Sequence, residues 1–145
     1  FNTTQVPDFL LILVLLISLE EGVRGGALTG LAVGALQDVI TLSFFGYHII
    51  TRLLIGVSVG LLRGNIFKDS LPTFLVLTAL ASALLKLINI VFLMIYQKEL
   101  LPLWPFFYNM LKYIGWNIVI AIPMWIADKV VGEMQRRRQH RYYEI

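Results

Sequence analysis

Apolar residues gather in five runs, and short breaks rich in charged residues, glycine or proline separate them. The hydrocarbon core of a bilayer is about 30 Å thick, and a helix needs about 20 residues to cross it. Most of these runs are therefore typical of membrane-spanning helices. The pattern predicts helices over about residues 7–21, 26–45, 47–62, 72–96 and 106–128.

The first of these helices is the shortest. Its apolar run, residues 9–19, ends at Glu20 and Glu21 and is too short to cross the bilayer core unaided. Pro7 and Asp8 extend it toward the amino terminus, because proline and acidic residues are favoured in the first turn of a helix. We expect a short membrane helix that neighbouring helices shelter from lipid.

The composition agrees with a membrane domain. Of the 145 residues, 58% are hydrophobic and 14% are charged, whereas about 25% of a soluble domain is charged. The chain has no cysteine, which excludes disulfides and thiolate chemistry. Its two histidines, His48 and His140, cannot build a metal site alone. We expect one compact all-α membrane domain over residues 1–131, without metal or cofactor.

The distribution of lysine and arginine predicts the orientation. If the first helix runs inward, eight of the twelve cations lie on the cytoplasmic side and only Lys98 lies outside, as the positive-inside rule requires. This arrangement places a basic cytoplasmic tail at residues 132–145. It also starts the given sequence outside a bacterial inner membrane, so we expect one further helix upstream of Phe1 and a bundle of six.

Small residues recur at four-residue spacing on two helices. They lie on one face of each helix, which allows another helix to approach closely. The residues are Gly26, Gly30 and Gly34 on the second predicted helix and Gly56 and Gly60 on the third. Such faces are most often simple helix contacts, and we expect them to pack against a partner's helix.

Polar residues lie on the same faces, inside the apolar runs. Asp38 is expected to pair with Arg52 across the second and third helices, near the outer surface. Lys86 lies near the middle of the fourth predicted helix, where an ionisable group must face protein or water. These groups favour either an outward-facing polar pocket or a set of structural pairs. The candidate pocket residues are Asp38, His48, Arg52, Lys86, Asn89 and Asn117.

The basic tail suits the negatively charged inner leaflet. Arg136, Arg137, Arg138 and Arg141 follow the last apolar run directly, and each cation near an anionic surface contributes roughly 1 kcal/mol. Beside a membrane helix, this segment is not expected to bind nucleic acid.

The first half of the chain resembles the MreD family of rod shape-determining membrane proteins. The resemblance covers about residues 6–72. It includes a Pro7–Asp8 start, a glycine-rich turn, a Gly-x-x-x-Gly-x-x-x-Asp pattern ending at Asp38, and Gly46 and His48 after a short loop. The family's usual Gly-Leu-x-x-Asp is Ala-Leu-Gln-Asp here, at residues 35–38.

The resemblance implies a non-enzymatic component of the machinery that synthesises the lateral cell wall. It implies direct binding of MreC, a single-span protein, through its transmembrane helix. MreB filaments, the RodA polymerase and its transpeptidase partner would be linked indirectly through MreC. It also implies a fold similar to the substrate-binding S components of energy-coupling-factor vitamin transporters.

Three functions remain open. A scaffold fits the small-residue faces and the lack of a catalytic constellation in the sequence. A small-molecule-binding subunit of a transporter, like an S component, would use the polar pocket. A channel or ion transporter needs matched charges within the membrane, and Asp38 with Arg52 is the one candidate pair.

Overall fold

The computed structural model describes residues 8–42, 44–64, 70–98 and 102–143. These residues form four helices: α1 (Phe9–Thr41), α2 (Tyr47–Leu62), α3 (Leu71–Gln97) and α4 (Leu103–Tyr143). Within the described ranges there is no strand, so the all-α prediction is confirmed. The predicted number of five helices is wrong, because the first two predicted helices form the single kinked element α1.

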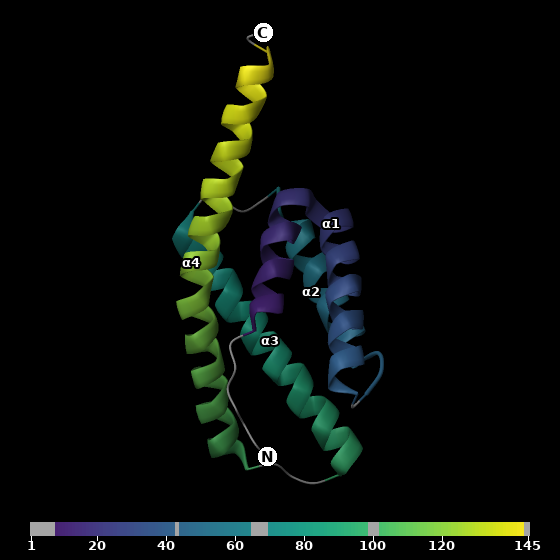
Figure 1. Ribbon diagram of the computed structural model, residues 1–145. Helices are drawn as coiled ribbons and strands as arrows, with labels where there is room; N and C mark the ends of the chain where they lie inside the picture. Colours follow the sequence, from purple (N-terminus) through teal and green to yellow (C-terminus); the bar gives the residue numbers. More distant parts are fainter. Residues whose placement is uncertain (1–7, 43, 65–69, 99–101, 144–145) are drawn as a thin grey trace.

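The kink in α1 lies at Gly22. Its backbone angles, φ 80° and ψ −154°, are far from helical and are accessible essentially to glycine alone. The chain reverses there, so that the two arms of α1 run in opposite directions (Figure 1). A Cβ atom added to Gly26 would lie 2.7 Å from Ser18 Oγ, which shows how closely the two arms pack.

The first arm of α1 lies in the centre of the bundle. Leu11, Ile12, Val14 and Leu15 are completely buried. Leu11, Ile12 and Leu15 share one hydrophobic core with Ile55 of α2, Phe74 and Leu77 of α3, and Ala121 of α4. The short helix is therefore enclosed by its neighbours, as its length predicts.

The helices associate as two pairs. α1 packs most extensively against α2, and α3 packs against α4. The turn between α1 and α2 is tight: Leu42 ends α1 with φ 52°, and Gly46 precedes α2 with φ 103°. This turn brings the end of α1 and the start of α2 to one end of the body (Figure 1).

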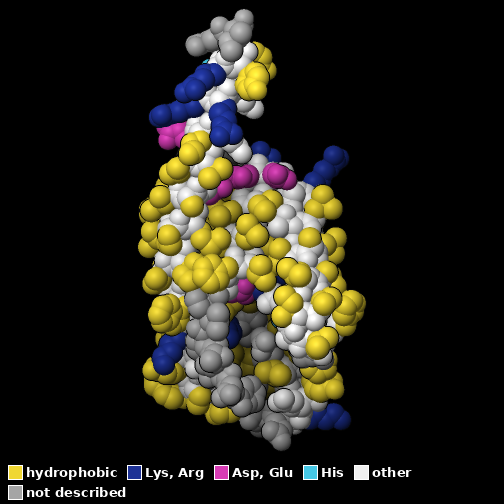
Figure 2. All heavy atoms as spheres, in the orientation of Figure 1, with side chains coloured by type: hydrophobic (Ala, Val, Ile, Leu, Met, Phe, Trp, Pro, Cys, Tyr) yellow, Lys and Arg dark blue, Asp and Glu magenta, His cyan; other side chains and the backbone are white. Residues whose placement is uncertain are grey.

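Two helices, α3 and α4, are long and apolar enough to cross a membrane, judged by length and composition. Exposed apolar side chains cover much of the visible face of the body, and cationic side chains gather on the projecting end of the chain (Figure 2). That end is the basic segment expected as a tail. It continues α4 as a helix to Tyr143.

Candidate functional site

A buried arginine is the centre of a polar cluster within the bundle. Arg52 of α2 is only 2% exposed. Its guanidinium forms an ion pair with Asp8, and its Nε donates to Gln37 Oε1 at 3.1 Å. The hydroxyl of Tyr113 on α4 donates to the same Asp8 carboxylate at 2.9 Å. Three helices are therefore joined around one carboxylate.

A second buried carboxylate, Asp38, holds the start of α2. Its Oδ2 accepts from the backbone N–H of Gly46 at 2.8 Å and of Ile49 at 3.3 Å. Its Oδ1 accepts from the backbone N–H of His48 at 3.0 Å and lies 2.8 Å from Nδ1 of that histidine. The first N–H groups of a helix have no partner within the helix and favour negative charge, so Asp38 caps α2 from the neighbouring helix.

The predicted pair of Asp38 with Arg52 is wrong. Asp38 is turned toward the first N–H groups of α2, whereas Arg52 reaches Asp8 instead. The physical reason is the reversal at Gly22, which lays the first arm back along the second arm and brings its start within reach of Arg52. Asp8 then supplies the negative charge that Arg52 requires in an apolar bundle.

Asn117 connects the cluster to the second helix pair. Its Oδ1 accepts from the backbone N–H of Asp8 at 2.8 Å, and its Nδ2 donates to Ser82 Oγ at 2.8 Å. Asn117 and Ser82 are both completely buried. A buried amide with all its groups paired fixes the relative position of α1, α3 and α4.

Lys86 lies beside this cluster on α3. Its Nζ is 4.4 Å from the centre of the Tyr113 ring, a favourable cation–π contact. Lys86 lines a small cavity of about 100 Å³ together with His48, Arg52 and Asn89. Of the predicted pocket residues, these four line the cavity. Asp38 and Asn117 do not line it, but each is hydrogen-bonded to a residue that does: Asp38 to His48, and Asn117 to Asp8.

The glycines predicted to pack against a partner's helix are in contact with one another inside the chain. A Cβ atom on Gly26 would lie 2.2 Å from the carbonyl oxygen of Gly56, and one on Gly56 would lie 2.1 Å from that of Gly26. Gly30, Gly34 and Gly60 meet the facing backbone in the same way, with Cβ positions 2.5 to 2.7 Å from it. These glycine faces pack α1 against α2 within the chain. The prediction that they bind a partner's helix is therefore wrong.

The arginines of the basic segment lie on the projecting part of α4. Arg136, Arg137, Arg138 and Arg141 are all exposed. Arg137 lies 3.7 Å from Glu133, one helical turn earlier. Their exposure leaves them accessible to an external anionic surface.

Four residues bonded within this network were not among the predicted site residues: Asp8, Gln37, Ser82 and Tyr113. Asp8 precedes the first apolar run, and its role depends on the fold-back of α1. Tyr113 lies in the last apolar run, where an aromatic residue is typical of simple packing. The proline–acid start of the family pattern is the sequence signal that points to Asp8, whereas Tyr113 carries no such signal.

The arrangement is that of a helical membrane protein whose internal charges hold its helices together. In the described ranges, no group of three His, Cys, Asp or Glu side chains is placed to hold a metal ion. Residues 2–128 match the family of the rod shape-determining protein MreD. The chain therefore belongs to this family of cell-shape proteins. No curated protein and no solved structure matches it significantly, so the predicted likeness to S components stays a prediction.

Removing the negative charge of Asp38 is expected to weaken the fold. In Asp38→Asn, one of the two accepting oxygens becomes an NH₂ group that faces N–H donors. We expect a loss of about 1–3 kcal/mol in the free energy of unfolding, the cost of leaving buried groups unpaired. Thermal unfolding in detergent measures it, and Glu21→Gln at an exposed carboxylate is the control. Equal midpoints for the two variants would contradict the capping role.

Proposed function

We propose that this chain is a non-enzymatic membrane scaffold of the complex that elongates the rod-shaped cell wall, and that it binds MreC directly. The observation that carries the proposal is the family match, which extends over nearly the whole helical body, residues 2–128. The other elongation proteins, MreB filaments, RodA and its transpeptidase partner, would be linked through MreC. Neither a cofactor nor nucleic acid has a part in this function.

The polar cluster supports a scaffold more than a transport subunit. Most of its charged and amide groups bind one another across the helices, which leaves little hydrogen-bonding capacity for a ligand. Among the described residues, Nη1 of Arg52 is the guanidinium nitrogen left without a hydrogen-bond partner. The outward cavity measures about 100 Å³, whereas pockets for small molecules range from about 300 to 1,000 Å³. A vitamin-sized substrate therefore does not fit the described residues.

The proposed setting is the bacterial inner membrane, crossed several times, with the carboxyl terminus in the cytoplasm. Arg63 packs against Gly22 at the kinked end of the body. Glu20, beside this kink, lines one cavity with Arg136 of the projecting part of α4. The cations Arg24, Arg63 and those of the basic segment are thereby gathered at one end, which supports a cytoplasmic position for that end. The exposed arginines then face anionic lipids.

The contact with MreC is proposed to use its transmembrane helix and the exposed apolar faces of this chain. The glycine faces are filled within the chain, so a partner must bind elsewhere. Large apolar side chains are exposed along the outer faces of α3 and α4, including Leu80, Leu84, Leu111 and Val119. Shape complementarity between such faces is the main source of helix association in lipid.

Co-purification of the two proteins tests this function. The chain, tagged and co-expressed with MreC, is expected to retain MreC through detergent extraction and gel filtration. MreC with its transmembrane helix replaced by an unrelated apolar helix is the control and is expected to be lost. Purification of the folded chain without MreC under these conditions would overturn the proposal.

A further inference from the structure

A second and larger cavity lies at the opposite end of the body from the polar cluster. It measures about 390 Å³ and is formed where the first arm of α1, the start of α3 and the last part of α4 meet. This volume falls within the range of about 300 to 1,000 Å³ that is typical of sites for small ligands. None of the predicted site residues except Arg136 lines it.

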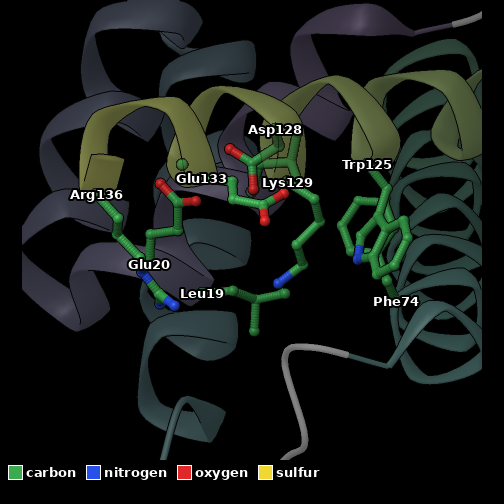
Figure 3. Close-up of a pocket in the computed structure, with 10 residues that line it drawn as sticks. Leu19, Glu20, Phe74, Trp125, Asp128, Lys129, Glu133 and Arg136 are labelled. Carbon is green, nitrogen blue, oxygen red and sulfur yellow. The ribbon is translucent and has the colours of Figure 1, made fainter. Parts of the chain in front are cut away.

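The cavity has an apolar wall and a charged rim. Leu16, Leu19, Phe74 and Trp125 form the apolar wall. The rim holds three carboxylates and two cations, which are Glu20, Asp128, Glu133, Lys129 and Arg136. Figure 3 shows Arg136 and Glu133 toward one end and Trp125 beside Phe74 at the other, with the Lys129 side chain extending between them toward Leu19.

Trp125 supplies a further hydrogen-bond donor at this place. Its indole Nε1 is buried and has no hydrogen-bond partner among the described residues. A buried donor without an acceptor costs about 1–3 kcal/mol. Tryptophan is enriched at the level of the lipid headgroups, where its ring meets hydrocarbon and its N–H meets polar groups. An acceptor oxygen from outside the chain would satisfy this donor.

In the proposed orientation, the cavity lies at the depth of the lipid headgroups on the cytoplasmic side of the membrane. Glu20 precedes the kink at Gly22, and the cavity is lined by the end of this arm and by residues 125–136 of α4. The last part of α4 projects beyond the apolar body (Figures 1 and 2). The occupant must therefore offer an apolar part toward the bundle and both signs of charge toward the rim.

We propose that this cavity binds the headgroup of a zwitterionic phospholipid that carries a primary ammonium group, that is, a phosphatidylethanolamine. The phosphate would lie against Arg136, Lys129 and the indole N–H of Trp125. The ammonium would donate to Asp128 and Glu133, and an acyl chain would lie along Leu16 and Phe74. This proposal stands apart from the scaffold function and does not depend on MreC.

The charges distinguish this lipid from the alternatives. The rim carries both signs of charge, and a lipid of net negative charge, such as phosphatidylglycerol, offers no cationic group to its carboxylates. A choline headgroup carries the same positive charge as ethanolamine but has no N–H donor for the carboxylates. A primary ammonium forms charge-assisted hydrogen bonds with them, which are the strong ones.

Native mass spectrometry of the purified full chain tests the proposal. Phosphatidylethanolamine, phosphatidylcholine and phosphatidylglycerol with identical acyl chains are added in equal amounts. We expect the ethanolamine lipid to bind about tenfold more tightly than either of the others, as one charge-assisted hydrogen bond predicts. Equal binding of the three lipids, a preference for either of the other two, or no retained lipid would overturn it.

Matched variants localise the site. Arg136→Gln and the double variant Asp128→Asn with Glu133→Gln remove groups that line the cavity. Both are expected to lower ethanolamine-lipid binding about tenfold. Arg138→Gln and Glu21→Gln alter exposed charges that do not line it and are expected to bind as the unaltered chain does. The five substituted side chains all lie near the surface, so the variants are expected to fold. Circular dichroism checks this for each variant. Equal losses in both groups would overturn the assignment.

Discussion

Replacing Arg52 with methionine is expected to lower the free energy of unfolding by about 3–5 kcal/mol, the cost of breaking a buried ion pair by removing one partner. The change leaves the carboxylate of Asp8 without its cation, although it still accepts from the Tyr113 hydroxyl and the backbone N–H of Leu11. It also removes the donor to Gln37 and so leaves a second, half-buried acceptor without this bond. The measurement is denaturant unfolding in detergent micelles, with the yield of folded protein in membranes as a second reading.

Two further variants distinguish a charge effect from a packing effect. Lys112→Met removes an exposed cation at the same end of the body and is expected to change stability by at most about 0.5 kcal/mol. The double variant Arg52→Met with Asp8→Asn removes both charges, so it is expected to recover part of the loss. An Arg52→Met variant as stable as Lys112→Met would contradict the structural role of the pair.

Replacing Gly56 with valine is expected to separate α1 from α2 and to cost at least about 3 kcal/mol, the upper end for overpacking a core. The first added carbon would already lie 2.1 Å from the carbonyl oxygen of Gly26. Neither backbone can move away without losing the same contact at Gly30 and Gly60. The folded yield and the melting temperature in detergent measure the effect.

Gly115→Ala is the matched control for this substitution. Gly115 lies within α4, and an added Cβ atom would meet nothing within 4 Å. Because alanine is favoured over glycine in a helix by about 1 kcal/mol, this variant is expected to be as stable as the original or slightly more so. If valine at position 56 were tolerated as well as alanine at position 115, the close approach of α1 to α2 would be wrong.

The hydrophobic pattern predicted the all-α class and the positions of the helices, because an apolar run between polar breaks in a membrane protein is almost always a helix. The predicted helix 47–62 has the bounds of α2. The glycine spacing correctly indicated close helix approach. It did not indicate which helix approaches, because a face of small residues looks the same whether the facing helix is in the same chain or in another.

The remaining features depend on tertiary structure. The reversal at Gly22 requires a backbone conformation that the local run of glutamate and glycine allows but does not impose. Without it, Asp8 lies far from Arg52, so the nearest acid in the pattern, Asp38, looked like the partner. The inner cavity also depends on segments that lie far apart in the sequence, since Glu20 meets Arg136 only through the packing of α1 and α4.

The central claim is that the buried polar groups hold the fold of a scaffold and perform no chemistry or ligand binding of their own. The most direct test is shape rescue in rod-shaped bacteria depleted of their own protein of this family. Cells would express this chain or its Arg52→Met, Asp38→Asn, Lys86→Met or Asn117→Ala variant, and cell width would be compared with the amount of folded protein in the membrane. The account predicts that width recovers in proportion to the folded amount for every variant. A variant that accumulates folded at the level of the unaltered chain yet leaves the cells round would contradict it.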